Sequence, residues 1–324
     1  MGYTPPFTIT ARSVSLVAEI NEEVGRLTTT EGLTRDPKLR RINRLKSIQS
    51  SLAIENNSLT LEQVTDIIDG KPVLGKPREI QEAKNAFAAY DAMGDFDPVC
   101  VQDLLNAHGI MMGMILEDAG RFRHAGVGVF SDKGVVHMAP PADRVPGLIG
   151  ELMEWLRYSD DHPLIKSCVF HYEFEFIHPF SDGNGRVGRM WHTLILSKWR
   201  EIMAWVPIES IVREHQQEYY DAIALSTKKA DSSPFIELML SLILGALKVS
   251  VSAKGRRDMP FLNLTERRLL SMIEDGMFVT AEDAAEALSI SRRTVERTIQ
   301  SLRAKGLIER EGSNKTGNWR LVSD

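Results

Sequence analysis

The stretch His178-Pro-Phe-Ser-Asp-Gly-Asn-Gly-Arg-Val-Gly-Arg189 determines how the rest of the chain is interpreted. It places an imidazole, a carboxylate, two glycines around an asparagine and two arginines within little more than one loop. Apolar helical runs lead into it and, from Met190 to Trp199, out of it. Glycines allow backbone N–H groups to converge on an anion, and the start of a helix adds its positive dipole end. This composition favours a phosphate ligand over a plain helix–loop–helix corner.

Each residue type in the loop suits one part of a site for a nucleotide and Mg²⁺. Arg186 and Arg189 offer fork-shaped donors to phosphate oxygens. Asp182 can hold a divalent cation between phosphate oxygens. His178 titrates near neutral pH and can take a proton from an incoming hydroxyl. The loop residues expected to hold the phosphate chain are Gly183, Asn184 and Gly185.

The same stretch resembles the signature of Fic-domain proteins, H-P-F-x-[D/E]-G-N-G-R-x-x-R, and matches it at every fixed position. The resemblance extends from near the N-terminus to about Val251 and implies a mainly helical domain. It also implies a protein adenylyltransferase that moves the AMP part of ATP onto a Ser, Thr or Tyr hydroxyl of a target protein. In that activity His178 is the catalytic base, Asp182 binds Mg²⁺, and both arginines bind the phosphates.

The bulk composition predicts two soluble globular domains. The chain has 324 residues, of which 43% are apolar and 26% are charged. Its 39 Lys and Arg against 44 Asp and Glu give a net charge of −5, which argues against a generally cationic nucleic-acid-binding surface. Cys100 and Cys168 have no metal-type spacing, so we interpret both as reduced core residues of a cytoplasmic protein.

No membrane partner is expected. The N-terminus lacks the basic-then-apolar pattern of a signal sequence. The most apolar stretch, Phe235 to Val251, contains two charged residues, and we predict that it is a buried helix rather than a membrane span.

A predicted helix from Leu39 to Ala53 runs into Ser51-Leu-Ala-Ile-Glu55-Asn56. Taken alone, this pattern is typical of a solvated helix end. Beside the signature, it resembles the inhibitory motif of the family, [S/T]-x-x-x-E-[G/N]. The resemblance implies that Ser51 and Glu55 belong to an inhibitory element in which Glu55 pairs with Arg189. A guanidinium engaged by a carboxylate cannot also clamp a γ-phosphate.

Two further segments have interpretations that depend on the family resemblance. Short β-type runs flank Ser131-Asp-Lys-Gly134 and predict a hairpin. In the family such a hairpin is a flap that holds the target by strand addition, and the alternative is a surface hairpin with no ligand. The residues of the flap expected to bind the target are Val135, Val136, His137 and Met138.

A single helix is predicted from Ile211 to Ser226, and it contains the aromatic pair Tyr219 and Tyr220. The resemblance implies that an aromatic residue near this place encloses the adenine, whereas an aromatic pair on a helix is otherwise a core feature. Another helix is predicted from Asp97 to Met114, with proline at its first position.

The C-terminal part has a different character. After a charged, breaker-rich linker at 254–260, three helices and two short strands are predicted, which resemble a winged helix-turn-helix domain. The third helix, from Arg292 to Lys305, would read DNA through residues at its start, and Lys315 would lie in the wing. The candidate DNA-binding residues are Arg292, Arg293 and Arg297. Neighbouring acidic residues leave a protein-binding role open.

The predicted architecture is mainly α. It comprises a Fic-like domain at 1–253 with an N-terminal arm, an inhibitory helix, a core at about 98–226 and a small hairpin flap, followed by a winged-helix domain at 261–324. The predicted function is an adenylyltransferase autoinhibited by Glu55. The alternatives are removal of AMP with Glu55 positioning a water, transfer of another phosphate-linked group, or a nucleotide-sensing DNA-binding regulator. A homodimer is also considered, in which Glu55 would act on its own subunit or a neighbour's.

Overall fold

The computed structural model describes residues 3–29, 36–131, 134–252, 264–274, 280–288, 290–305, 307–311 and 318–322. The chain divides into two compact units, Met1–Ser252 and Ala253–Asp324, and each is described by itself. The predicted linker at 254–260 lies outside the described residues. The mainly helical fold with one small hairpin in the first unit is confirmed.

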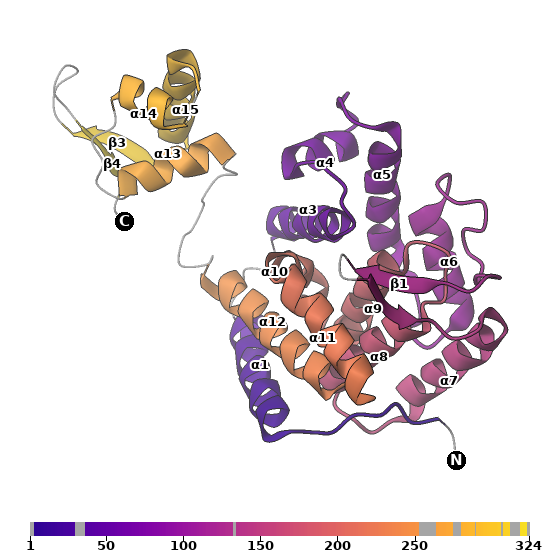
Figure 1. The fold of residues 1–324 in the computed structure, drawn as a ribbon. Coiled ribbons are helices and arrows are strands. Elements are labelled where there is room, and N and C mark those ends of the chain that lie inside the picture. The colour runs from indigo at the N-terminus through magenta and orange to yellow at the C-terminus, as the bar shows by residue number, and fades with distance from the viewer. Residues whose placement is uncertain are drawn as a thin grey trace. The chain divides into compact units, whose positions relative to one another are not determined.

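The first unit is built almost entirely of helices (Figure 1). Its α-helices are α1 (Ala11–Thr29), α3 (Pro37–Ile54), α4 (Leu61–Ile68), α5 (Pro77–Ala92), α6 (Val101–Met112), α7 (Val145–Tyr158), α8 (Pro163–Ile177), α9 (Asn184–Trp199), α10 (Ile208–Glu214), α11 (Gln216–Lys229) and α12 (Ser233–Ser252). Its 3₁₀ turns are η1 (Met93–Asp95), η2 (Ala142–Arg144) and η3 (Glu201–Trp205). An antiparallel hairpin is formed by β1 (Gly128–Ser131) and β2 (Gly134–Met138), with an irregularity between Val129 and Phe130.

The centre of the first unit is the helix pair α8 and α9, which pack against each other on either side of the signature loop. Both helices are buried along most of their length, and α8 is apolar on nearly every face. α12 packs against α1, α8, α10 and α11. Figure 1 shows α1 and α12 side by side. This arrangement holds the loop between two fixed helix ends.

Among the described residues, one helix, α12, is long and apolar enough to cross a membrane when judged by length and composition. In the structure, 61% of its apolar window Ser233–Ser250 is buried inside the protein. Its buried side chains, which include Phe235, Leu240 and Ile243, belong to the main hydrophobic core. The packing seen here is that of a core helix, as was predicted for this stretch.

Helices α3, α4 and α5 pack together and form what we call the N-terminal layer (Figure 1). Asp36 caps α3 by accepting from the N–H groups of Lys38 and Leu39. α4 begins with a capping box, because the side chains of Thr60 and Gln63 each accept a hydrogen bond from the other residue's backbone N–H group. The layer therefore has defined helix ends, and α3 finishes at Glu55, its C-terminal cap.

A buried carboxylate, Glu209 on α10, ties this layer to the core. It accepts hydrogen bonds from the hydroxyls of Ser47 on α3 (2.7 Å), Tyr90 on α5 (2.7 Å) and Thr193 on α9 (3.1 Å). Only 2% of Glu209 is exposed. A buried carboxylate needs such donors, so these bonds fix where α3 sits relative to α9.

Two helix predictions for the first unit were wrong in their bounds. The helix expected over Ile211–Ser226 is split at His215 into α10, which packs against α3, and α11, which packs against α12. The helix expected from Asp97 begins only at Val101. The preceding segment stays non-helical because the Asp97 side chain accepts from Val99 N–H, and Trp191 Nε1 donates to the carbonyl of Pro98.

The second unit contains three helices and a hairpin within its described residues. These elements are α13 (Leu264–Glu274), α14 (Ala281–Leu288), α15 (Arg292–Ala304), β3 (Ile308–Glu311) and β4 (Asn318–Leu321). Its small core includes Leu269, Val295 and Leu302, and Ser291 caps α15 by accepting from Thr294 N–H. The predicted winged helix-turn-helix fold is confirmed, whereas Lys315 lies outside the described residues.

The Glu209 contacts lead to a stability prediction. Tyr90→Phe removes one donor from a buried carboxylate and should lower the free energy of unfolding of the first unit by about 1.5–3 kcal/mol, the range for hydrogen bonds to charged groups. The exposed Tyr158 offers a matched control, because Tyr158→Phe should change stability very little. Thermal denaturation of both variants measures the difference. Equal melting temperatures for the two would contradict the anchoring role of Glu209.

Candidate active site

His178 lies at the C-terminal cap of α8 in the left-handed conformation, with φ of 51° and ψ of 62°. Its N–H donates to Phe174 O, which closes the last turn of the helix. The buried Arg123 holds the next peptide group: its Nε donates to His178 O at 2.7 Å. Non-glycine residues adopt this conformation only where surrounding contacts enforce it. These contacts set the direction in which the chain leaves α8.

Arg123 also connects this turn to the segments around the hairpin. Its Nη2 donates to Pro140 O (2.6 Å) and to Ile177 O (3.2 Å), and its Nη1 donates to Ala125 O (2.9 Å). Only 2% of the residue is exposed. One guanidinium thus joins the end of α8 to the chain on both sides of β1 and β2.

The loop closes on itself through Asn184. The Asn184 side-chain oxygen accepts from Phe180 N–H (2.9 Å), and its NH₂ group donates to Phe180 O (2.8 Å). We predicted that Asn184 would contact phosphate, but its buried amide is already used to close the loop. Gly183 has φ of +85°, and a Cβ there would lie 2.6 Å from Met112 Sδ, so glycine is required at this position. Any anion contact from Asn184 therefore falls to its backbone N–H.

Phe180 anchors the loop in the core. It is fully buried and stacks on His108, with ring centroids 3.7 Å apart. His108 Nδ1 accepts from Gly120 N–H (2.9 Å), which leaves the ring proton on Nε2 to donate to Asp182 O (3.0 Å). Burial lowers the pKa of His108, which favours this neutral form. His108 is therefore a structural support of the loop.

Arg189 is held by the end of α3. Its Nη2 lies 2.7 Å from Glu55 Oε1 and donates to Ser51 O (3.0 Å), while its Nε donates to Ser51 Oγ (3.1 Å). The side chain of Arg189 is 3% exposed and that of Glu55 is 32% exposed. Burial acts to lower the pKa of Arg189, but the charge of Glu55 keeps that pKa above its ordinary value.

Gly185 lies where these two side chains meet. A Cβ at this position would overlap Glu55 Oε1 and would lie 2.8 Å from Arg189 Nη1. The absence of a side chain therefore leaves room for the Glu55 carboxylate above the start of α9. The signature thus needs glycine here for the Glu55 contact as well as for an approaching anion.

Asp182 and Arg186 face each other at the start of α9. Arg186 Nη2 donates to Asp182 Oδ1 at 3.1 Å, and Gly183 N–H donates to the same oxygen at 2.6 Å. The Arg186 side chain is 4% exposed and that of Asp182 is 41% exposed. Arg186 Nε has no hydrogen-bond partner among the described residues. A buried guanidinium N–H without a protein acceptor suits an anionic ligand.

Glu175 is a second carboxylate buried near Arg189. Burial raises its pKa to about 7, the charge of Arg189 opposes that rise and the charge of Glu55 adds to it. Its Oε1 has no hydrogen-bond partner among the described residues and lies 3.8 Å from His171 Nε2. Burial also lowers the pKa of His171 well below its ordinary value, so this contact joins a neutral imidazole to a carboxyl group.

The tyrosine pair predicted to enclose adenine is divided by the structure. Tyr219 is 1% exposed, its hydroxyl lies 3.1 Å from His171 Nε2, and its ring packs against Phe235 in the core. It is therefore unavailable to a nucleotide, and this part of the prediction was wrong. Tyr220 is 41% exposed and stays accessible. Strand β2, which carries the predicted flap residues 135–138, lies against α11, the helix of both tyrosines.

The candidate DNA-binding residues lie at the start of α15 in the second unit. Arg293 and Arg297 are exposed. Arg292 forms ion pairs with Glu282 and Glu296, so part of its charge is neutralised within the unit.

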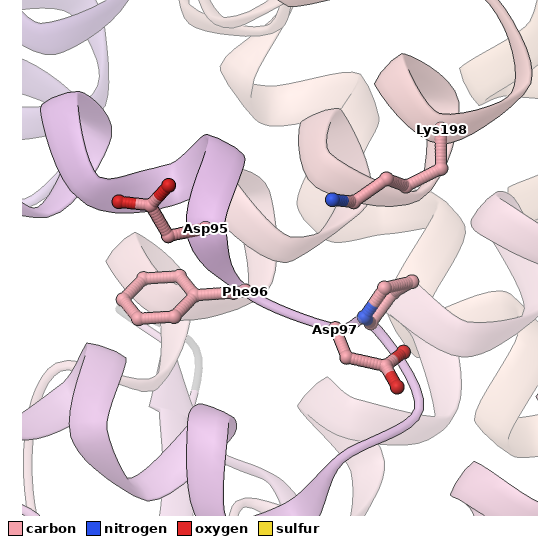
Figure 2. Close-up of a pocket in the computed structure, with 5 residues that line it drawn as sticks. Asp95, Phe96, Asp97 and Lys198 are labelled. Carbon is pink, nitrogen blue, oxygen red and sulfur yellow. The ribbon is translucent and has the colours of Figure 1, made fainter.

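A small open hollow elsewhere on the first unit is lined by Asp95, Phe96, Asp97, Pro98 and Lys198. Figure 2 shows Lys198 on one side and Asp95, Phe96 and Asp97 along the segment after α5. Lys198 is near the far end of the 16-residue α9, about 20 Å from the loop at 1.5 Å per residue. No predicted site residue lines it.

Within the part of the chain that the structure describes, no group of three or more His, Cys, Asp or Glu side chains could hold a metal ion.

Several site residues were missed by sequence reasoning. Arg123 lies in the segment after Gly120, which shows no periodicity, and His108 looks like an ordinary helix residue. Arg78 and Glu82 on α5 contact the loop from about a hundred positions away: Arg78 Nη2 donates to Asp182 Oδ2, and Glu82 pairs with Arg186. Only three-dimensional structure brings these side chains together, because no local pattern marks them.

Known protein families and solved structures match both parts of this chain. The Fic/DOC family model matches residues 98–196, and a model of an HTH domain matches residues 265–317. A solved Fic family protein from Desulfovibrio desulfuricans G20 is 46% identical, covers 99% of both chains and has a TM-score of 0.76. Fic-1 (aa134–508) from C. elegans covers 76% of this chain and 74% of its own, with a TM-score of 0.64; at 21% identity this likeness concerns the fold alone.

Curated relatives share less of their length. "Protein adenylyltransferase Fic" of Aedes aegypti is 25% identical over 264 residues, which cover 76% of this chain and 50% of the relative. The protein of the same name from Culex quinquefasciatus is 28% identical over 207 residues, which cover 60% of this chain and 39% of the relative. The chain therefore spans half or less of the length of these relatives.

The buried Glu175 leads to a pH prediction. Its pKa of about 7 in the folded protein exceeds the ordinary 4.5. Between these values the folded state keeps a proton that the unfolded state releases, so Glu175 lowers stability as pH rises, with the full penalty above pH 7. The stability advantage of Glu175→Gln over wild type should therefore grow between pH 5 and pH 8, by on the order of 2 kcal/mol in the free energy of unfolding.

Thermal melting at both pH values measures this gain, with the exposed Glu154→Gln as the matched control. An advantage for Glu175→Gln that does not grow with pH would show that Glu175 is already ionised at pH 5.

Proposed function

Since this chain belongs to the Fic family, we propose that it transfers the AMP part of ATP to a hydroxyl side chain of a target protein and that Glu55 holds it inactive. The observation that carries this proposal is the loop itself. It gathers a histidine, a solvent-accessible carboxylate and two buried arginines around the start of one helix. The curated relatives named adenylyltransferases support the reaction type.

The phosphate chain of ATP would bind at the N-terminus of α9. The first N–H groups of this helix lie beside Gly183 and Gly185, and helix N-termini attract anions. Arg186 would contact the β-phosphate, and its Nε is a donor that has no acceptor among the described residues. Arg189 would contact the γ-phosphate once Glu55 no longer occupies it. Of the tyrosine pair, Tyr220 is the remaining candidate for contact with the adenine.

Mg²⁺ fits the donor set only when ATP is present. Asp182 is the single accessible carboxylate of the loop, and Mg²⁺ is commonly held by one or two carboxylates together with substrate phosphate oxygens. Asp182 would hold the cation, which would neutralise phosphate charge during transfer.

His178 would act as the general base. It takes the proton from the target hydroxyl as that oxygen attacks the α-phosphorus. The bond from the α-phosphorus to the oxygen that bridges it to the β-phosphate breaks, and pyrophosphate leaves. The left-handed backbone of His178, held by Arg123 at its carbonyl, supports this role because it fixes the residue at the start of the loop. Such positioning lowers the entropic cost of bringing the hydroxyl and the phosphate together.

The hairpin is the proposed binding place for the target segment. β1 and β2 form a sheet of only two strands, so the backbone of β2 can pair with an extended peptide through residues 135–138. Main-chain pairing positions a hydroxyl without demanding one particular sequence around it. The position of β2 against α11 supports this role.

We infer a DNA-binding role for the second unit as a separate proposal. The match to an HTH domain and the exposed Arg293 and Arg297 at the start of α15 support it. Phosphate neutralisation dominates such binding, so retention on DNA should fall steeply with salt and should weaken when both arginines are replaced.

The base assignment gives the first test of the proposed function. His178→Ala should lower AMP transfer by about 10²–10⁴-fold, the usual contribution of a general base, while ATP still binds. His215→Ala, which changes an exposed histidine outside the signature loop sequence, is the matched control. Transfer is measured with labelled ATP and Mg²⁺ and with intact mass of the protein. Full activity of His178→Ala would refute the assignment.

The inhibitory assignment gives the second test. Glu55→Gly should raise transfer, because Arg189 loses the carboxylate that competes with the γ-phosphate. Intact-mass analysis after incubation with ATP and Mg²⁺ should detect one added AMP on the protein or on added target proteins. The double variant Glu55→Gly, His178→Ala is the control and should be inactive. No increase in a folded Glu55→Gly protein would argue against autoinhibition.

A further inference from the structure

Four charged side chains form a closed ring that joins α5 to the loop. Arg78 Nη2 lies 3.1 Å from Asp182 Oδ2, and Asp182 Oδ1 lies 3.1 Å from Arg186 Nη2. Arg186 Nη1 lies 3.3 Å from Glu82 Oε1, and the same oxygen lies 3.3 Å from Arg78 Nε. We call this set of residues the ion ring. Two members come from α5 and two from the signature loop.

The ion ring engages both carboxylate oxygens of Asp182. Oδ1 accepts from Gly183 N–H and from Arg186, and Oδ2 accepts from Arg78. Oδ2 keeps a second lone pair, but a cation bound there would lie beside the positively charged Arg78 guanidinium, which repels it. The Arg78 guanidinium therefore sits where a bound cation would place its positive charge.

The edges of the ion ring differ in exposure, which determines where it opens. The side chains of Arg78 and Asp182 are 61% and 41% exposed, whereas those of Arg186 and Glu82 are 4% and 12% exposed. An exposed ion pair exchanges with solvent ions at little cost, and a buried one is fixed by its surroundings. The edge between Arg78 and Asp182 is therefore the one that yields to a ligand.

The ion ring is also connected to the chain that follows Glu55. Glu82 Oε2 accepts from Asn57 Nδ2 at 2.9 Å, and Asn57 Nδ2 also reaches Glu79 O at 3.2 Å. Asn57 is buried, and its N–H donates to Leu52 O at the end of α3. Each signature arginine is thus paired with a glutamate of the N-terminal layer: Arg189 with Glu55, and Arg186 with Glu82.

We propose that Arg78 and Glu82 form a second inhibitory contact on the same loop, in which Arg78 occupies the cation-binding oxygen of Asp182 and Glu82 holds Arg186. This proposal rests on the proposed function, because it takes Asp182 as the Mg²⁺ ligand and Arg186 as a phosphate ligand. Cation binding is then strengthened when Arg78 leaves Asp182. Both signature arginines become available to phosphate only when the pairs Arg189–Glu55 and Arg186–Glu82 are broken.

The test measures ATP affinity by isothermal titration calorimetry, with Mg²⁺ and with EDTA, in the full chain bearing Glu55→Gly. The ratio of the two affinities reports the contribution of the cation. Arg78→Ala should raise this ratio about two- to fivefold, the range that an exposed ion pair covers. Lys76→Ala is the matched control, since it removes an equal charge two residues away that pairs with Glu79 instead, and it should leave the ratio unchanged.

Two more variants make the result decisive. Asp182→Asn should reduce the ratio; if it does not, the Mg²⁺ role of Asp182 in the proposed function fails and the second contact fails with it. If Asp182→Asn reduces the ratio but Arg78→Ala does not raise it, the second contact alone is refuted. Glu82→Gln, which keeps an oxygen for Asn57, should tighten ATP binding in EDTA. Weaker binding would show that Glu82 orients Arg186 for phosphate, contrary to the proposal.

Discussion

The structure depends on how a buried guanidinium is neutralised. Arg189 emerges from the second turn of α9 into a place that is almost closed to solvent, and an isolated charge there would be costly. Glu55 and Ser51 at the end of α3 neutralise and bond it in the present structure. The N-terminal layer is therefore held against the core by the same interaction that removes Arg189 from use. In the proposed function, the γ-phosphate of ATP and Glu55 compete for one buried cation.

The loop can take part in this competition because its backbone is fixed independently of the arginines. Arg123 donates to the carbonyl of His178, and the Asn184 side chain closes the turn by bonding Phe180. His108 donates to the carbonyl of Asp182. None of these contacts involves Arg186 or Arg189. Removing Glu55 or Glu82 should therefore change which ligands the loop binds while its shape stays the same.

The local parts of this account could be predicted from the sequence. Helix ends with caps, such as Thr60 with Gln63, follow local chemistry, and the signature loop resembles one family at every fixed position. The burial of Tyr219 and the break at His215 could not be predicted, because they depend on tertiary packing: α10 packs against α3 as well as α12, and α11 packs against α12. The ion ring could not be predicted from the sequence either, since Arg78 and Asp182 come together only when α5 packs beside the loop. Tertiary packing decides these features, and a single sequence carries no periodic signal for it.

The central claim is that Glu55 and the γ-phosphate compete for Arg189. The most direct measurement compares the affinities of ATP and ADP for wild type and for Glu55→Gly by calorimetry. The account predicts that wild type binds the two nucleotides about equally, whereas Glu55→Gly prefers ATP by about 10- to 100-fold, the range of a hydrogen bond to a charged group. An equal preference for ATP in both proteins would contradict it, because Arg189 would then be available to the γ-phosphate despite Glu55.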